Sequence, residues 1–409
     1  MRIEASGRLV SLDIFRGLTI GAMIVVNNLR DWSDLPGFRQ LAHTEWHGCT
    51  LADLIFPFFI FIVGVTAVFS LEKRQTAGES LPRLYRHIFI RSALLFFLGL
   101  LVCSYFIIGW LLQTICPPTA TQESMWAILL SPPAPSKLWF FSLANLRIMG
   151  ILQRIALVYL VVALLIIHTR WRLQAAVCAA LLLLYWGLMS LPGFPLEPGK
   201  DLGAYLDHLI LGEAHLWLTW DPESLLGTLP AIATGLAGAL TGHWLLSSRS
   251  GSRKLLGILL FGVLGIGLGA LWGKVFPLNK FLWTSSYVVY TAGFALVFLG
   301  AIYWLIDLRR VRGAWDQPCV WLGMNPLIAY CGSQVMFIAL QVLYIGMPPH
   351  HTHLITVISN ALFGVNWDVI GVTGWRDPRL PALIWALICL SFWTMITGLM
   401  YRRRLFVKI

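Results

Sequence analysis

The sequence contains little charge for its length. Asp, Glu, Lys and Arg make up 12% of its 409 residues, about half of the roughly 25% found in soluble domains. Hydrophobic residues make up 58%, more than the core of a soluble fold of this size can bury, so soluble enzymes and disordered chains are excluded. The seven cysteines include no CxxC pair, which argues against a zinc or disulfide framework. The composition predicts a protein that crosses a lipid bilayer several times.

Long apolar runs make up most of the chain. A spanning helix needs about 20 mostly apolar residues, and ten segments meet this requirement. Because a bilayer offers no water to backbone groups, the spans must be helical. We predict an all-α, polytopic transmembrane bundle of ten or eleven spans, one domain over residues 1–409, with the ninth span bent near Asn325-Pro326. The ten segments are residues 9–29, 52–71, 88–112, 145–167, 173–191, 225–246, 255–272, 286–306, 318–344 and 380–401.

Basic residues are distributed unevenly between the two sets of loops. If the N-terminus is inside, the cytoplasmic segments hold 18 of the 30 Lys and Arg residues, and the opposite loops hold 8. This asymmetry predicts that both termini are cytoplasmic. It also accounts for most of the net charge of +11 without a nucleic-acid partner. On the opposite side, residues 354–365 are expected to form a helix along the membrane interface.

Ionisable side chains within the spans mark candidate functional sites, because burying charge in a membrane is costly. Asp13 and Arg16 lie three residues apart in the first span, where they can pair, or Arg16 can bind a phosphate. Arg147 and Arg154 are seven apart and are expected to share one face of the fourth span, beside Gln153. Arg154 is too deep to reach water easily. It therefore needs a buried acidic partner or a polyanionic ligand, and the ligand is favoured.

The stretch from Asn27 to Asp53 is the densest polar run beside a span. His43 and His47 are four apart, a spacing that on a helix allows a shared metal. However, AHTEWHG is not an HExxH motif and no third ligand is evident from the spacing, so no metal is expected. Two interpretations stay open. The segment is an interfacial loop anchored by Trp46, or a histidine accepts a proton at the membrane face.

Further polar residues fall at the same outer level of the predicted bundle. Each can serve as a helix cap or a packing contact, and together they can line a polar cavity. These residues are Asp221, Glu223, Asn279, Lys280, Trp283 and Ser286.

An ordered set of segments resembles the heparan-α-glucosaminide N-acetyltransferase family and its bacterial relatives. The segments are SLDIFRG, VNN, AHTEWHGCTLADLIFPFFIFIVG, GILQRIALVYL, YLDHLILGEAHLW, WDPESLLGT, NKFLWTSSYV and GMNPLIAY, from about residue 8 to about residue 331. The resemblance implies a transferase that moves an acetyl group from cytoplasmic acetyl-CoA to the amine of a glucosamine unit outside. It also implies a multi-pass protein of a bacterial inner membrane. The sequence leaves the oligomeric state open, a homodimer included.

The resemblance also assigns catalytic roles. The family's essential histidine lies in an H-x-x-W-x-G motif, which matches residues 43–48. The role of base or acetyl carrier therefore falls on His43 rather than His47. Independently of the resemblance, the chemistry of amine acetylation predicts that Asn27 or a nearby donor stabilises the oxyanion formed from the thioester carbonyl, and that Asp13 or another carboxylate orients the imidazole.

Coenzyme A is long and anionic, so its phosphates require cations. The residues expected to bind it are Arg16, Arg91, Gln153, Arg154, Lys280, Trp283 and Ser286. The residues expected to contact the amino sugar are Trp46, Asp221, Glu223 and Asn279.

The alternative to an enzyme is an amino-sugar or ion transporter without acyl transfer, because charges at the membrane midplane and broken helices suit a transporter equally well. A catalytically silent relative is a third alternative.

Overall fold

The structure is a computed structural model that describes residues 9–29, 38–103, 146–217, 219–342, 344–345, 352–353, 358 and 379–407. Within these residues the regular secondary structure is almost entirely helical, as the composition predicts. The exception is a two-residue antiparallel pair of strands, β1 (Tyr344–Ile345) with β2 (Thr352–His353). The expected interfacial helix over residues 354–365 lies outside the described residues except for Ile358.

Nine of the described helices are long and apolar enough to cross a membrane, and a bent pair raises the number to ten. This confirms the predicted polytopic helical bundle. The nine are α1 (Val10–Asn28), α2 (Leu51–Thr76), α3 (Leu81–Cys103), α6 (Ile151–His168), α7 (Trp171–Met189), α9 (Thr228–Leu246), α10 (Gly251–Trp272), α11 (Ser285–Tyr303) and α15 (Arg379–Arg402). A π-helical turn, η5 (Trp304–Leu308), extends α11. Shorter elements are α8 (Leu202–Ile210), η4 (Glu213–His215) and η6 (Ala314–Asp316).

The bent pair lies where the sequence predicted a bend. Helix α12 (Gln317–Met324) and helix α13 (Pro326–Val342) are separated by Asn325. The helix axis bends by 78° at this break. Pro326 has no backbone N–H, and its ring disfavours a helical conformation at the residue before it. Asn325 instead holds the C-terminal tail, donating to the carbonyl oxygen of Leu405 over 3.2 Å and accepting from the backbone N–H of Val407 over 3.1 Å.

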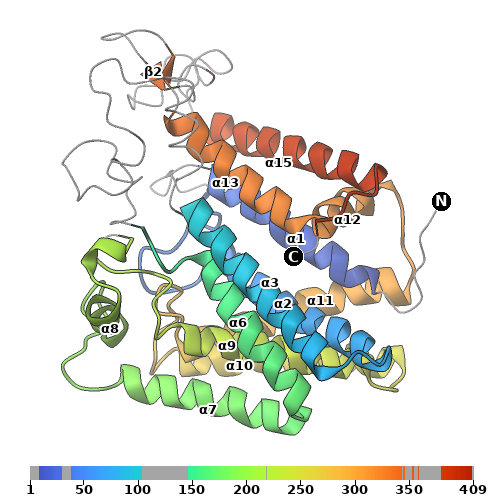
Figure 1. Cartoon of the computed structure of the whole chain (residues 1–409), viewed down its shortest axis with the longest axis horizontal. Helices are drawn as coiled ribbons and strands as arrows, with labels where there is room; N and C mark the ends of the chain where they lie inside the picture. The colour runs from blue at the N-terminus through green and yellow to red at the C-terminus, as the bar shows by residue number, and fades with distance from the viewer. Residues whose placement is uncertain are drawn as a thin grey trace.

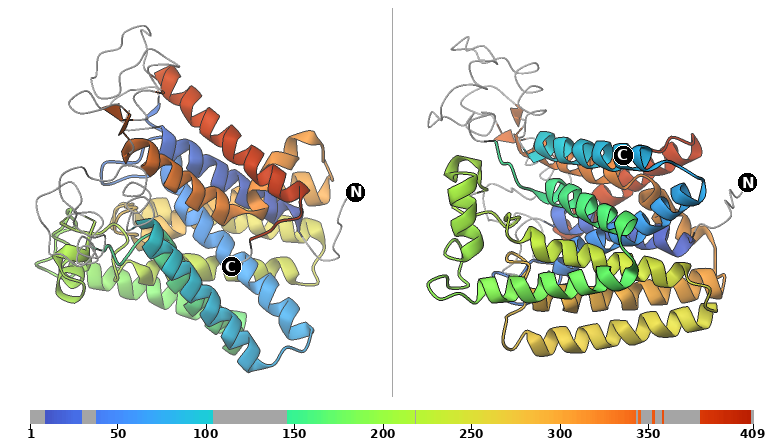
Figure 2. Two further views of the ribbon diagram at one scale, coloured as in Figure 1. Left: turned by 45° about the horizontal axis from the view of Figure 1, so that its top comes forward. Right: turned by 60° about the horizontal axis from the view of Figure 1, so that its bottom comes forward.

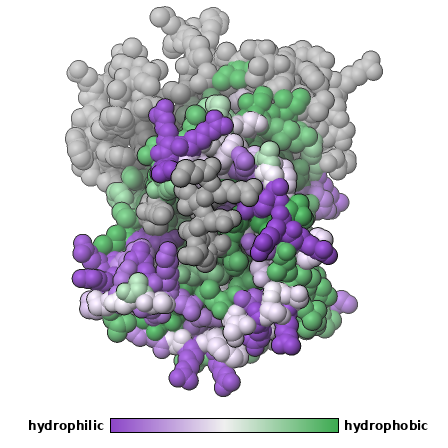
Figure 3. Space-filling model, turned by 90° about the vertical axis from the view of Figure 1, so that its right-hand side faces the viewer, coloured by the Kyte–Doolittle hydropathy of each residue, from purple (hydrophilic) through white to green (hydrophobic). Residues whose placement is uncertain are grey.

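The spans give the molecule two distinct ends. Figure 1 shows α8 at one end and the α2–α3 turn, with the start of α1, at the other. We call these the His43 end, where the segment 38–50 enters α2, and the Arg74 end, where α2 turns into α3. Figure 2 shows α7, α9, α10 and α11 on one side of the bundle, with α1 and α15 on the other. Figure 3 views the side of the molecule that carries the α2–α3 turn, where hydrophilic side chains are spread among apolar ones.

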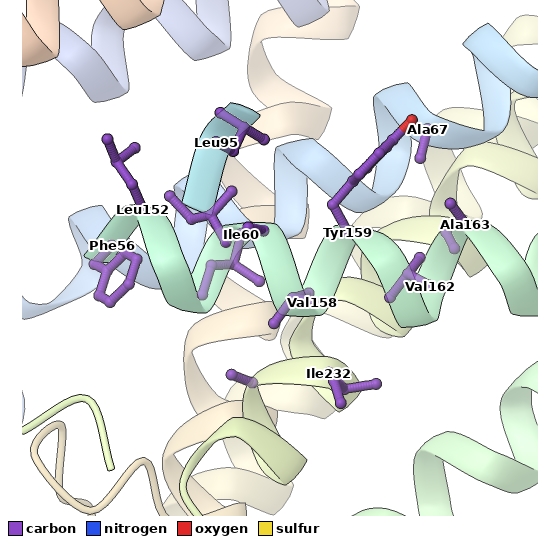
Figure 4. Close-up of a cluster of buried hydrophobic side chains, with 14 of the residues drawn as sticks. Phe56, Ile60, Ala67, Leu95, Leu152, Val158, Tyr159, Val162, Ala163 and Ile232 are labelled. Atoms are coloured by element: carbon purple, nitrogen blue, oxygen red, sulfur yellow. The ribbon is translucent and has the colours of Figure 1, made fainter. Parts of the chain in front are cut away.

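The core lies where α2, α3, α6 and α9 meet. Figure 4 shows Ile60, Leu95, Leu152 and Val158 among the side chains packed there. These four are at most 5% exposed. Lipid tails are as apolar as leucine, so such helices associate by close packing rather than by excluding water. The packing therefore depends on shape.

Helices α2 and α9 cross with their backbones almost in contact. A Cβ atom placed on Gly64 would lie 1.9 Å from the carbonyl oxygen of Gly235, and one placed on Gly238 would lie 2.0 Å from that of Phe61. Only glycine permits such an approach, which is a common device in membrane bundles. The crossing holds the middle of α2, the helix whose first turn carries the candidate site.

Candidate functional site

A buried carboxylate lies in the first turn of α2. Thr50 caps the helix, and Asp53 completes a capping box with it, a pattern that satisfies otherwise unpaired N–H groups. Asp53 is fully buried. Its Oδ2 atom accepts from the backbone N–H and the hydroxyl of Thr50, both at 3.0 Å, and from the same two groups of Thr44 at 3.2 and 3.1 Å. The carboxylate is therefore locked in one orientation.

The other oxygen of this carboxylate faces His43. Nδ1 of His43 lies 2.8 Å from Oδ1 of Asp53, and the imidazole remains 42% exposed. Because Nδ1 faces a buried carboxylate, it carries the ring proton, and Nε2 keeps its lone pair. The carboxylate fixes both the tautomer and the orientation of the ring. This is the arrangement of a histidine base with an orienting acid.

Lys280 completes the cluster from a distant part of the chain. Its Nζ atom lies 2.9 Å from Nδ1 and 3.2 Å from Nε2 of His43, and 3.4 Å from Oδ1 of Asp53. Only 16% of the side chain is exposed. Burial lowers the pKa of Lys280, while the carboxylates of Asp53 and Glu223 oppose that shift. A cation, an imidazole and a carboxylate thus share one small site.

Two neighbouring side chains are unsuited to the same chemistry. Burial and the charge of Asp53 raise the pKa of the Cys49 thiol to about 12, so it is not a thiolate nucleophile at neutral pH. His47 accepts a hydrogen bond at Nδ1 from the side-chain amide of Asn279 over 3.3 Å, and burial lowers its pKa. His47 therefore faces an amide, whereas His43 faces a carboxylate and a cation.

Arg147 lies before α6 and not on it. The prediction that Arg147 and Arg154 share a helix face is wrong, because the chain is extended at Gly150 and α6 begins only at Ile151. Arg147 donates to both oxygens of Asp221, from Nε over 2.8 Å and from Nη2 over 2.7 Å, and its Nη2 also donates to Glu223. The predicted sugar-binding carboxylates are thus already engaged by an arginine.

Arg154 is fully buried near the start of α6. Its Nη2 donates to the carbonyl oxygens of Pro222 and Ser224, each over 3.3 Å. Its Nε and Nη1 atoms are buried without a hydrogen-bond partner among the described residues. The guanidinium lies 5.1 Å from the ring centre of Trp283. Among the described residues, backbone carbonyls and an aromatic face contact this cation, and no carboxylate pairs with it directly.

Trp283 connects Arg154 to the His43 cluster. It is 1% exposed, donates from Nε1 to the hydroxyl of Thr234 over 3.1 Å, and contacts Tyr287 edge to face. The hydroxyl of Tyr287 donates to the backbone carbonyl of Asp53. Trp283 is a non-glycine residue with φ of 55°, a conformation that usually needs a structural reason. Here the left-handed turn places the indole in the core three residues after Lys280.

An aromatic wall lies beside the cluster at the His43 end. Trp46 stacks on Phe281 with ring centres 5.5 Å apart and meets Trp220 edge to face at 5.3 Å. Trp46 also donates from Nε1 to the carbonyl oxygen of Leu196 over 2.7 Å. Such faces suit the C–H surface of a ring, but the expected role of Trp46 with a sugar stays a prediction.

Three predicted binding residues have structural partners. Asn279 is fully buried and accepts from the backbone N–H of Leu282 over 2.9 Å. Ser286 donates to the carbonyl oxygen of Phe276. Gln153 packs against α3, where a Cβ on Gly99 would lie 2.3 Å from its Oε1. Their expected contacts with ligand stay predictions.

A second group of cations surrounds a cavity at the Arg74 end. The cavity has a volume of about 490 Å³. Arg91 lies 4.4 Å above the ring centre of Tyr159, and its Nε is buried without a hydrogen-bond partner among the described residues. Glu79 pairs with Arg74 at 3.0 Å and offsets part of the positive charge. The lining residues are Arg74, Glu79, Arg83, Arg86, His87, Ile90, Arg91 and Leu94.

The three arginines expected at the CoA phosphates do not converge. Arg16 lies at the start of α1, pairs with Asp13 at 3.6 Å and donates to the carbonyl oxygen of Gly323 over 3.0 Å. Arg91 lies within α3, and Arg154 lies near the His43 end. The cations are therefore spread along the bundle from one end to the other.

Two expected catalytic residues also lie elsewhere. Asp13 pairs with Arg16 near the start of α1, about 20 Å along the helix from Asn27 at a rise of 1.5 Å per residue. The carboxylate that contacts His43 is Asp53, so the structure favours another carboxylate over Asp13 as the orienting acid. Asn27 donates from its amide to Oε1 of Gln334 over 3.4 Å, and its oxyanion role stays a prediction.

The sequence did contain a signal for Asp53. Thr50 followed three residues later by an acidic residue, ahead of an apolar run, is a capping-box pattern. That pattern predicts the start of a helix but does not show that His43 folds back onto the same carboxylate. Within the described ranges, no group of three or more His, Cys, Asp or Glu side chains is arranged to hold a metal ion.

The fold and this site define a polytopic helical membrane protein with a histidine–carboxylate pair at one end of its bundle. Residues 8–116, which include His43 and Asp53, match the family described as heparan-alpha-glucosaminide N-acetyltransferase, catalytic. The chain is 26% identical to the heparan-alpha-glucosaminide N-acetyltransferase of Mus musculus, covering 100% of this chain and 61% of that protein. It is also 26% identical to the Homo sapiens protein, covering 98% of this chain and 60% of the relative. These matches confirm the resemblance to this family of membrane N-acetyltransferases, and the chain spans about three fifths of the length of both relatives.

Proposed function

We propose that the protein is a membrane N-acetyltransferase that moves the acetyl group of acetyl-CoA to the amine of glucosamine or a glucosamine-containing sugar. The observation that carries this proposal is the contact of His43 with the fully buried Asp53 at one end of a membrane bundle. The names of the matched relatives support the reaction class. The donor enters from the cytoplasm at the Arg74 end, and the acceptor binds at the extracytoplasmic His43 end.

The chemistry requires a base beside the acceptor. An amine attacks a thioester only in its neutral form, and amines with a pKa near 8 are largely protonated at neutral pH. Nε2 of His43 takes the proton of the amine, while Asp53 stabilises the imidazolium that forms. The same proton then passes to the departing CoA thiolate. His43 acts in this way as the base, or it carries the acetyl group between donor and acceptor.

The donor's phosphates fit the cations at the Arg74 end. The cavity beside Arg91 presents several guanidinium groups, which bind phosphate oxygens in bidentate fashion. The buried Nε of Arg91, which has no hydrogen-bond partner in the part of the chain that the structure describes, supports a ligand there. Arg16 lies at the same end of the bundle. Arg154 and Trp283 are assigned to the thioester end, because both lie close to the elements that hold Asp53.

The acceptor is assigned to the outer surface beside His43. The wall of Trp46, Phe281 and Trp220 offers aromatic faces to a sugar ring. Glu223 is near enough for its charge to act on Lys280, and it can attract a protonated amino group before the proton is removed. Asp221 and Asn279 shape the same region through their contacts with Arg147 and His47.

The test is a transfer assay with purified protein in liposomes. We expect CoA thiol release that depends on glucosamine, with N-acetylglucosamine detected by mass spectrometry. His43→Ala should lower the rate by about 10²–10⁴-fold, whereas His47→Asn should keep most of it. Transfer at a near wild-type rate by His43→Ala would overturn the assigned role of His43.

A transporter is the alternative that one observation favours. The break of 78° between α12 and α13 resembles the discontinuous helices that line substrate sites in transporters. A transporter would move intact glucosamine into protein-containing liposomes without acetyl-CoA. An acetyltransferase would consume acetyl-CoA and accumulate the acetylated sugar.

A further inference from the structure

Lys280 lies within reach of the nitrogen that would take the proton of an acceptor amine. Its Nζ lies beside the imidazole of His43, 2.9 Å from Nδ1 and 3.2 Å from Nε2, and Nε2 is the nitrogen left free to accept a proton. A general base must lie within about 2.6–3.2 Å of the proton donor it serves, and Lys280 meets this distance without any ligand present. The nucleophile of a competing reaction is therefore built into the site.

The turn that carries Lys280 holds it there. The backbone N–H of Trp283 donates to the carbonyl oxygen of Lys280 over 3.2 Å, and the backbone N–H of Thr284 donates to the carbonyl oxygen of Asn279 over 3.1 Å. Trp283 is buried in the core and anchors the turn. The backbone of Lys280 is therefore positioned by the fold, which keeps its side chain within reach of His43.

We propose that Lys280 is a self-acetylation site, whose Nζ takes the acetyl group of the bound thioester when no acceptor amine occupies the site. This inference rests on the proposed function, because it needs an acetyl thioester delivered beside His43. Acetyl-CoA or another small acetyl thioester is the reagent.

The reaction balances without any further reactant. The ammonium of Lys280 gives a proton to Nε2 of His43, and the neutral Nζ attacks the thioester carbon. An N–C bond forms, the C–S bond breaks, and the electron pair leaves with sulfur. The ammonium loses two protons in all: one passes through His43 to the thiolate, and the other goes to solvent. The products are acetyl-lysine and free thiol.

The same features separate Lys280 from exposed lysines. Lys200 is 67% exposed and donates to Glu197 over 2.8 Å, and this partner raises its pKa. Burial lowers the pKa of Lys280, so more of it is neutral at a given pH. A nucleophile held beside its base also gains from proximity, because intramolecular reactions reach effective concentrations far above those in solution.

Acetylation would alter the site that performs it. The amide has no charge, so Asp53 would lose the cation 3.4 Å from its Oδ1. The acetyl group would also lie against the imidazole of His43. We therefore expect acetylated protein to transfer acetyl groups to glucosamine more slowly, and glucosamine to protect the enzyme by occupying the site first.

The experiment measures acetyl occupancy at individual lysines. Purified protein in liposomes is incubated with acetyl-CoA alone, digested at intervals and analysed by mass spectrometry. Lys280 should be acetylated at least tenfold faster than the exposed Lys200 and Lys274, and glucosamine should suppress this. His43→Ala should abolish the difference. Lys280→Arg keeps the positive charge and controls for modification elsewhere; its transfer rate, expressed relative to its own starting value, should not decline with time.

The possible failures are distinguishable. CoA thiol release with glucosamine is measured in the same preparation. If release is normal while Lys280 is acetylated no faster than Lys200, or equally fast in His43→Ala, the self-acetylation proposal alone is overturned. If the protein neither releases thiol nor acetylates glucosamine, the proposed function fails, and this inference fails with it.

Discussion

The Nδ1 atom of His43 lies 2.8 Å from Oδ1 of Asp53, a carboxylate with no exposed surface. The two residues are ten positions apart, one in the segment before α2 and the other in the first turn of that helix. Four hydrogen bonds from Thr44 and Thr50 hold the second oxygen. The acid therefore stays fixed, and the imidazole takes its orientation from it.

Replacing Asp53 by Asn tests this relationship directly. The amide keeps the size of the side chain but removes the charge that stabilises the imidazolium. It can also present an N–H to Nδ1, which favours the tautomer with the proton on Nε2. We expect the transfer rate to fall by about 10²-fold or more.

Two controls accompany the Asp53→Asn measurement. Glu45→Gln removes an exposed carboxylate from the same segment and should retain the wild-type rate. A thermal denaturation curve of Asp53→Asn shows whether α2 still folds. A folded Asp53→Asn protein with wild-type transfer would contradict the orienting role.

The buried pair of Arg147 and Asp221 predicts a stability effect. The side chain of Arg147 is 14% exposed and that of Asp221 is fully buried. Removing one partner leaves a buried charge, at a cost of about 3–5 kcal/mol. Arg147→Met should therefore lower the unfolding temperature markedly, while Lys200→Met, which breaks an exposed pair with Glu197, should change it little. Equal shifts for the two variants would contradict this.

Asp207 predicts a dependence of stability on pH. It is fully buried, its Oδ1 accepts from the backbone N–H of Leu225 over 2.9 Å, and its Oδ2 has no hydrogen-bond partner among the described residues. Burial raises its pKa from 3.8 to about 7. The folded state then binds more protons than the unfolded state between these values, so the contribution of Asp207 to stability falls as pH rises through this range.

Asp207→Asn should remove that dependence. The amide oxygen can keep the bond from Leu225, and no charge has to be buried. The variant should unfold at a higher temperature than wild type at pH 8, and the difference should shrink towards pH 4. Thermal denaturation across this range is the measurement, and a difference independent of pH would show that Asp207 titrates normally.

The crossing of α2 and α9 predicts a strict requirement for glycine. Gly238→Ala would place a methyl group 2.0 Å from the carbonyl oxygen of Phe61, so the helices must separate. We expect a loss of about 1–3 kcal/mol or more, as for other overpacked cores. Gly267→Ala on α10 meets no atom within 4 Å and is the matched control. If both variants unfold at the wild-type temperature, the crossing is looser than the structure indicates.

Several elements of the fold could be predicted from residue patterns alone. Apolar runs of about 20 residues located the spans, because a membrane-spanning helix must bury its whole length in lipid. The bend at Asn325 followed from the geometry that proline imposes on its neighbour. The predicted fourth span begins at residue 145, but α6 begins at Ile151. An extended segment before a helix has no periodic pattern that would mark where the helix starts. The extended Gly150 there moved Arg147 off the helix.

The site was only partly predictable. The segment around His43 stood out by its polar content and its family motif. A charge inside a span is conspicuous in a sequence and draws attention to Asp13, but Asp13 pairs with Arg16 at the other end of α1. Asp53 is less conspicuous, because an acid at a helix start has an ordinary capping role; in the structure it caps α2 and contacts His43.

The sequence by itself showed that this is a membrane protein built from helices, and it predicted which loops lie on the cytoplasmic side. Each of these conclusions rests on composition or charge summed over many residues, so a wrong interpretation of one residue does not change it. Only the tertiary structure decided which groups meet His43. Lys280 lies 237 positions away in the chain, and its contact exists because α2 and α11 pack together and a buried Trp283 holds the connecting turn. Contacts of this kind depend on packing geometry, which no local pattern encodes.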